Sequence, residues 1–142
     1  MNLDLLKNPF AYKLKVNLSE VGEPQEMVID IPETFNYLLG LKVKKVKVRY
    51  NGVPEKRKYL FILGEKDGKN IAVVWREYQD RWTEKDLIED RNYIVKELEF
   101  WMSNTDISVV YINGQSILTN KLGKDEVEIR YIEPEFKKLM EA

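Results

Sequence analysis

Basic side chains gather in one short stretch of the sequence, residues 42–58. This stretch holds eight lysines and arginines and one acidic residue, so it carries a net charge of +7, whereas the whole chain carries −1. Cations alternate with apolar residues over 43–50, which predicts a strand with Lys45, Lys47 and Arg49 on one face. On that face they stand about 6.5–7 Å apart, close to the spacing of successive phosphates along one DNA strand.

These cations predict contacts to the phosphates of DNA, because lysine and arginine displace the counterions that condense on a duplex. A second interpretation stays open. Lysines on one face of an antiparallel strand ordinarily face solvent and discourage pairing at a sheet edge. The candidate DNA-binding residues are Lys45, Lys47, Arg49, Arg57 and Lys58, together with Arg76 and Arg81.

Aromatic and arginine side chains are interleaved where a later strand ends, at Trp75, Arg76, Tyr78, Arg81 and Trp82. Aromatic rings beside arginines are able to stack on nucleic-acid bases. The alternative is that Trp75 belongs to the hydrophobic core and the other four form its polar rim.

Histidine and cysteine are absent from the chain, which excludes Ser/His and Cys/His catalysis, thiolate metal sites and disulfides. A magnesium nuclease is a third hypothesis, because the expected element order matches a restriction-endonuclease core. That chemistry needs an acid on the second core strand and Glu-x-Lys on the third. The third strand carries Ala72, Val73 and Val74 at the positions of these ligands. A magnesium ion would therefore have to be bound by Glu65 or Asp67 of the adjacent hairpin. We assign no catalytic residue and no metal ligand.

Patterns along the first half predict a strand, a helix and three further strands. Residues 11–18 alternate as a strand does. Asp30 and Glu33 form a capping-box variant, and Gly40 stands at the expected end of the helix that they begin. The stretches 43–50, 58–65 and 70–76 follow, separated by turn residues, and the last two are apolar on both faces, as central strands are.

The second half predicts a long helix over 84–102, capped by Thr83, and then a buried strand over 107–112. A right-handed crossover would place that strand parallel to 70–76. An edge strand over 126–133 and a terminal helical turn complete the chain. We therefore expect one α+β domain over residues 1–142, with a mixed, largely antiparallel sheet in the order β-α-β-β-β-α-β and helices packed on it.

No apolar run approaches the roughly 18 residues that a membrane span needs, and the first ten residues lack the pattern of a signal peptide. We expect a cytoplasmic protein with no membrane partner.

Several segments together carry a resemblance to a known family. The stretch MVIDIPETFNYLLGLKV, then GKNIAVVWRE, DISVVYINGQS and EPEFKKLM, resembles the C-terminal region of adenine-N6 DNA methyltransferases of the type III restriction-modification kind. The resemblance spans nearly the whole chain, and residues 33–41 are its most specific part. In this motif we expect Glu33 to cap the helix and Asn36 and Tyr37 to be free for polar contacts.

The resemblance implies a non-catalytic accessory module. The family's Asp/Asn-Pro-Pro-Tyr loop and its S-adenosylmethionine-binding Phe-x-Gly-x-Gly loop are both missing. The stretch NPFAY at residues 8–12 does not match the Asp/Asn-Pro-Pro-Tyr pattern. We expect no cofactor in this chain, since S-adenosylmethionine belongs to the parent family's catalytic domain. The expected roles are DNA-backbone binding, docking to the catalytic domain, or both. The alternative is a purely structural or assembly module that contacts a restriction subunit or a second copy as a homodimer.

Overall fold

The computed structural model describes residues 9–10, 13–16, 25–28, 30–52 and 57–142. Its central element is a five-stranded mixed sheet in the spatial order β3-β4-β5-β6-β9, so the predicted α+β class is confirmed. Strands β3, β4 and β5 are antiparallel neighbours, while β5, β6 and β9 run parallel. The strands are β3 (Lys42–Asn51), β4 (Arg57–Lys66), β5 (Lys69–Arg76), β6 (Val109–Ile112) and β9 (Glu128–Tyr131).

A two-residue turn fixes the register of the two central antiparallel strands. Lys66 pairs with Lys69, and Asp67 and Gly68 between them have φ angles of 52° and 76°. Two residues with positive φ give the turn whose twist matches that of the flanking strands. The register that follows turns Tyr59 and the alternate residues after it towards one face of the sheet.

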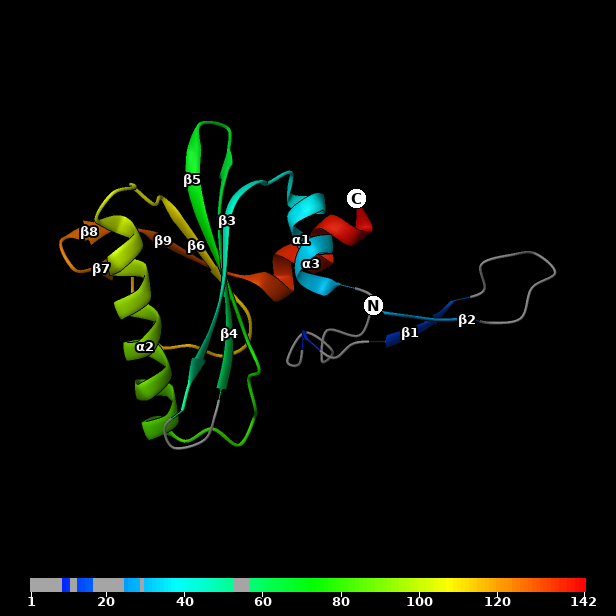
Figure 1. The fold of residues 1–142 in the computed structure, drawn as a ribbon, viewed down its shortest axis with the longest axis horizontal. Coiled ribbons are helices and arrows are strands. Elements are labelled where there is room, and N and C mark those ends of the chain that lie inside the picture. Colours follow the sequence, from blue (N-terminus) through cyan, green and yellow to red (C-terminus); the bar gives the residue numbers. More distant parts are fainter. Residues whose placement is uncertain (1–8, 11–12, 17–24, 29, 53–56) are drawn as a thin grey trace.

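In the described part of the chain, helices cover both faces of the sheet, as Figure 1 shows. The helix α2 (Glu84–Met102) packs on one face, and α1 (Ile31–Leu39) and α3 (Ile132–Glu141) pack together on the other. Because α2 connects β5 to the parallel strand β6, the predicted strand–helix–strand crossover is confirmed.

Local signals in the sequence define where α1 and α2 begin and end. The carboxylate of Asp30 accepts a hydrogen bond from the Glu33 amide at 3.0 Å, and Gly40 ends α1 with a φ of 77°. Thr83 and Asp86 form a reciprocal capping box at the start of α2. These motifs satisfy amide groups that a helix terminus leaves unpaired.

Two hydrophobic clusters lie on opposite faces of the sheet. Under α1 and α3, the ring of Phe35 lies 5.8 Å from Trp75 and 5.5 Å from both Tyr111 and Phe136, measured between centroids. Under α2, a second cluster forms around Ile94 and other fully buried residues. Both clusters are centred on β4, β5 and β6, which leaves the outer strand β3 less covered.

The structure differs from the sequence predictions at both ends of the chain. Strand β1 (Lys13–Val16) pairs with β2 (Gln25–Val28) in a separate two-stranded sheet, so its expected place in the main sheet is wrong. A small hairpin, β7 (Lys121–Leu122) with β8 (Asp125–Glu126), was not predicted. The predicted terminal turn is the full helix α3, because Ile132 and Phe136 bury one side of it. The turn that SEVGEP predicts over 19–24 lies outside the described residues. The turn predicted at Asn51-Gly52 begins later than expected, because Asn51 is the last residue of β3 and pairs with Arg57.

Candidate functional site

Strand β3 is the most accessible part of the sheet and carries three of the seven predicted DNA contacts, Lys45, Lys47 and Arg49. It ends the strand order on one side, and among the described residues it pairs with β4 alone. A bulge interrupts the ladder between Val43 and Lys45, and the register is then regular from Lys45 to Asn51. An edge strand of this kind leaves alternate main-chain N–H and C=O groups facing outwards.

The side chains of β3 form two rows on opposite faces. The cation row, defined as Lys45, Lys47 and Arg49, pairs with Leu63, Phe61 and Tyr59 of β4 and therefore lies on the α2 face. The apolar row, defined as Val46, Val48 and Tyr50, pairs with Ile62, Leu60 and Lys58 and lies on the face of α1 and α3. The predicted alternation of this strand is confirmed.

Helix α2 compensates the positive charge at one end of the cation row. Arg49 Nε donates to Glu97 Oε1 at 3.2 Å, and the indole nitrogen of Trp101 donates to the same oxygen at 3.2 Å. Lys45 Nζ lies 5.6 Å from the centre of the Trp101 ring. The described carboxylates form no ion pair with Lys47, which stays exposed. The row is therefore partly neutralised within the molecule.

A second ion pair lies at the bulge. Lys44 Nζ is 2.9 Å from Glu65 Oε2 and also donates to Asn70 Oδ1 at 3.2 Å. The hydrogen bond from Lys44 lowers the pKa of Glu65. One of the two carboxylates named for the nuclease hypothesis, Glu65, is thus held by a lysine. Among the described residues, no group of three His, Cys, Asp or Glu side chains is placed to hold a metal ion.

The apolar row is largely exposed to solvent. Val46 is 51% and Val48 44% exposed, because α1 and α3 cover the central strands and stop short of the edge. Beside Val48 a hollow of about 270 Å³ is lined largely by apolar residues, including Phe10, Pro32 and Leu60. Adjacent exposed apolar side chains of this kind mark interaction surfaces.

Arg76 is in the core, so its predicted contact with DNA is wrong. Its side chain is fully buried, and Nε lies 3.0 Å from both carboxylate oxygens of Asp90. Its guanidinium also donates to the Gln115 carbonyl. The side chain of Asn113 accepts a hydrogen bond from the backbone N–H of Arg76 and donates one to its carbonyl, each at 2.8 Å. The charge of Arg76 is therefore neutralised inside the protein.

Arg57 requires the same correction. It is 4% exposed, donates from Nη2 to Asp86 Oδ1 at 2.7 Å, and stacks 4.6 Å from the centre of the Trp82 ring. The other two members of the candidate set lie nearer the surface. Lys58 is half-buried with its ammonium 4.5 Å from the Phe10 ring, and Arg81 is exposed and donates to Gln79.

The interleaved aromatic residues point inwards rather than outwards. Trp75 is fully buried under α1, which confirms its predicted place in the core. Tyr78 and Trp82 pack together on the side of the sheet opposite α1. The guanidinium of Arg76 lies 5.6 Å from the centre of the Tyr78 ring and 5.5 Å from that of the Trp82 ring. These contacts hold the arginine in the interior and leave neither ring open for base stacking.

One signal in the sequence could have located this buried ion pair. Asp90 falls within the apolar stripe of α2, three residues after Leu87 and four before Ile94, and all three are buried. An acidic residue in a buried stripe needs a cationic or hydrogen-bonding partner. Arg76 and the hydroxyl of Tyr59, 2.6 Å from Asp90 Oδ1, supply these partners.

The residues of the family-like motif have different environments. Glu33 is exposed in the first turn of α1, and Tyr37 is 83% exposed. Asn36 is 9% exposed, so the prediction that it is free for contacts is wrong. It shares the buried side of α1 with Phe35 and Leu39, one and three positions away.

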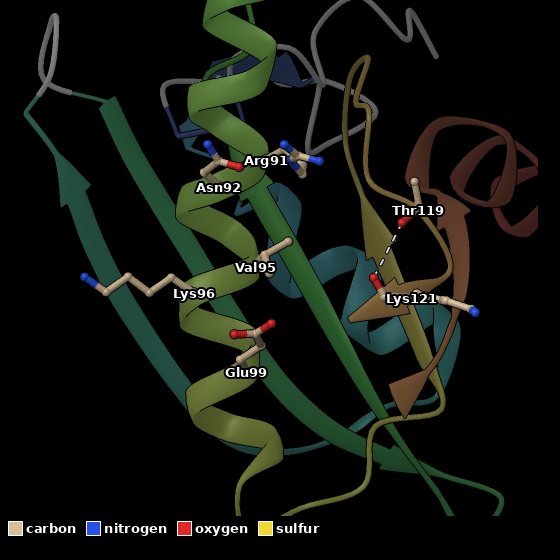
Figure 2. Close-up of a pocket in the computed structure, with 7 residues that line it drawn as sticks. All are labelled: Arg91, Asn92, Val95, Lys96, Glu99, Thr119 and Lys121. Atoms are coloured by element: carbon tan, nitrogen blue, oxygen red, sulfur yellow. Dashed lines mark hydrogen bonds between the residues drawn. The ribbon is translucent and has the colours of Figure 1, made fainter. Parts of the chain in front are cut away.

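A second hollow, of about 290 Å³, lies between α2 and the residues around β7, and Figure 2 shows its lining. It includes Arg91, Lys96 and Lys121, but their charged ends point in different directions. They therefore do not converge on a bound anion.

No family model, curated protein or solved structure matches this chain. The resemblance to adenine-N6 methyltransferases therefore rests on the sequence segments quoted above. None of the helices in the described part of the chain is long and apolar enough to cross a membrane.

Proposed function

We propose that this chain is a non-catalytic accessory module of an adenine-N6 DNA methyltransferase assembly, and that β3 docks it onto another polypeptide of that assembly. The partner is the catalytic domain, on which S-adenosylmethionine is expected to bind, or a restriction subunit. The observation that carries the docking role is the exposed apolar row on an edge strand. Membership in an assembly that modifies DNA would place the chain in the cytoplasm.

Several properties of β3 support a polypeptide partner. Val46 and Val48 offer apolar surface that phosphate groups do not use, whereas the centre of a protein interface is typically apolar with a polar rim. The cation row lies on the opposite face of this strand. Two cations of β3, Arg49 and Lys44, are already engaged by carboxylates, which reduces the charge left for phosphates.

The docking proposal is tested by mixing the purified chain with the catalytic region of a type III adenine methyltransferase from the same genome. Size-exclusion chromatography with light scattering should detect a complex of defined mass. Val46→Lys/Val48→Lys should abolish it, because lysines at these positions remove the apolar surface without disturbing the core. Ile88→Lys is the matched control, since Ile88 is an exposed aliphatic residue on α2. Complex formation that survives the double substitution on β3 would refute docking through this strand.

DNA-backbone binding is the second candidate function. It is supported by Lys42, Lys45 and Lys47, which are exposed along one strand and form no ion pair with the described carboxylates. Fluorescence anisotropy with a labelled duplex of about 20 base pairs, at low and moderate salt, measures it. Salt-sensitive binding that weakens in Lys45→Glu/Lys47→Glu, and not in the control Lys121→Glu/Lys124→Glu, supports this function. Absence of binding at low salt excludes it.

A further inference from the structure

We propose that β3 accepts an extended partner segment as a sixth strand of the sheet, and that this segment alternates acidic and apolar side chains. The inference rests on the docking function proposed above and specifies the chemistry of the partner.

The main chain of β3 is suited to pairing over a defined length. Beyond the bulge, the register with β4 is regular from Lys45 to Asn51. Among the described residues, no strand pairs with the outer edge of β3 over Lys45–Arg49, where alternate N–H and C=O groups have the spacing that an added strand requires. The bulge ends the regular ladder at Lys45, and the Tyr50 carbonyl already accepts a hydrogen bond from the Tyr93 hydroxyl at 3.4 Å. The partner strand is therefore expected to lie along residues 45–49.

The two rows of β3 side chains determine the composition of the partner. An added strand places alternate side chains on the two faces of the sheet. On the α2 face they lie beside the cation row, where carboxylates are favoured. On the opposite face they lie beside Val46 and Val48, where apolar side chains are favoured. A shift of one residue would exchange the two faces, so the side-chain pattern also fixes the register.

The pairing of Arg49 with Glu97 shows the same chemistry within the molecule. A carboxylate from α2 reaches the cation row at 3.2 Å. This end of the row is occupied, so the acidic residues of a partner are expected beside Lys45 and Lys47.

The cation row also determines which strands are rejected. A second copy of this chain that paired through its own β3 would bring lysines and arginines opposite one another, and like charges across a ladder are unfavourable. The lysines therefore protect this edge from self-association while leaving it open to an acidic strand.

Labelled synthetic peptides test the inference on the full chain. An acetylated peptide of alternating glutamate and valine, about seven residues long, should bind in fluorescence anisotropy. A lysine/valine peptide of the same pattern should not bind. A peptide with the glutamates and valines in separate blocks should bind about tenfold more weakly, because it cannot match both rows. Lys45→Glu/Lys47→Glu should abolish binding, whereas Lys121→Glu/Lys124→Glu should not.

N-methylation tests the main-chain pairing. In an added strand, either the glutamate or the valine N–H groups face β3 and the other set faces solvent. Methylation of one set should therefore abolish binding, and methylation of the other should leave it intact. Equal binding of both methylated peptides, or of the block and alternating peptides, would overturn strand addition and show only electrostatic attraction.

The two proposals fail in different ways. If the methyltransferase region binds through Val46 and Val48 while the alternating peptide does not bind, docking stands and strand addition is wrong. If the peptide binds and the methyltransferase region does not, strand addition to β3 stands and the proposed methyltransferase assembly is wrong.

Discussion

The lysines of β3 and the arginines of the neighbouring strands carry the same charge but lie in opposite environments. Lys45 and Lys47 stand on an open edge, whereas Arg57 and Arg76 lie in the interior beside Trp82. The sequence alone predicted one DNA-binding set that included all four. The comparison shows that the position of a strand within the sheet, rather than the type of residue, determines whether a cation is available to a partner.

Helix α2 is responsible for much of this difference. It supplies Asp86 to Arg57 and Asp90 to Arg76, and both arginines are buried beneath it. At its other end it supplies Glu97 to Arg49, which lies at the margin of the cation row. The arginines therefore fasten the helix to the sheet, while the lysines beyond its reach stay exposed.

Replacing Arg76 should give the largest change, because it leaves the carboxylate of Asp90 buried without its cation. Arg76→Ala is expected to lower the free energy of unfolding by about 3–5 kcal/mol. Urea denaturation followed by tryptophan fluorescence measures this loss, with Lys47→Ala as the control. A loss no greater than that of Lys47→Ala would show that the two environments are energetically alike and would break the comparison.

Arg57→Ala should give a smaller loss, of about 1–3 kcal/mol, because its partner Asp86 still reaches solvent and keeps its bonds to Thr83. The loss of packing against Trp82 contributes to the effect. The same denaturation experiment ranks the two arginines. If Arg57→Ala is the more damaging, the buried Arg76–Asp90 pair is not the principal link between α2 and the sheet.

Alkaline pH should weaken the buried cluster through Tyr59. Burial, followed by the charge of Asp90, raises the pKa of Tyr59, whereas an unfolded tyrosine titrates near pH 10. The folded pKa lies above the unfolded one, so the contribution of Tyr59 to stability is complete below about pH 10 and falls as the pH rises. The loss from this group is about 1.4 kcal/mol per pH unit. Urea denaturation between pH 9 and 11 should therefore show a steeper decline in the wild type than in Tyr59→Phe. Equal slopes would contradict the assigned protonation.

Charge reversal on β3 should give the smallest change in stability. Lys45→Glu/Lys47→Glu is expected to alter the free energy of unfolding by no more than about 0.5 kcal/mol, because both side chains are exposed. The same variant should lose its affinity for the alternating peptide. A strongly destabilised variant would indicate that the cation row serves the fold rather than a partner.

The sequence predicted the central elements well because their signals are local. The capping residues of α1 and α2 and the two-residue turn between β4 and β5 each act within a few positions. The burial of Arg57 and Arg76 depends on acids 29 and 14 residues away, which adjacent residues do not reveal. The β1–β2 pairing and the full length of α3 were missed for the same reason, since each depends on contacts outside its own segment.

The central claim is that β3 is the surface through which this chain binds its partner. Amide hydrogen exchange of the full chain, with and without the methyltransferase catalytic region, tests it most directly. Strand addition predicts slower exchange within residues 45–49 in the complex and unchanged exchange in β5, which is already paired with β4 and β6. A complex in which residues 45–49 exchange as fast as in the free chain would contradict the account.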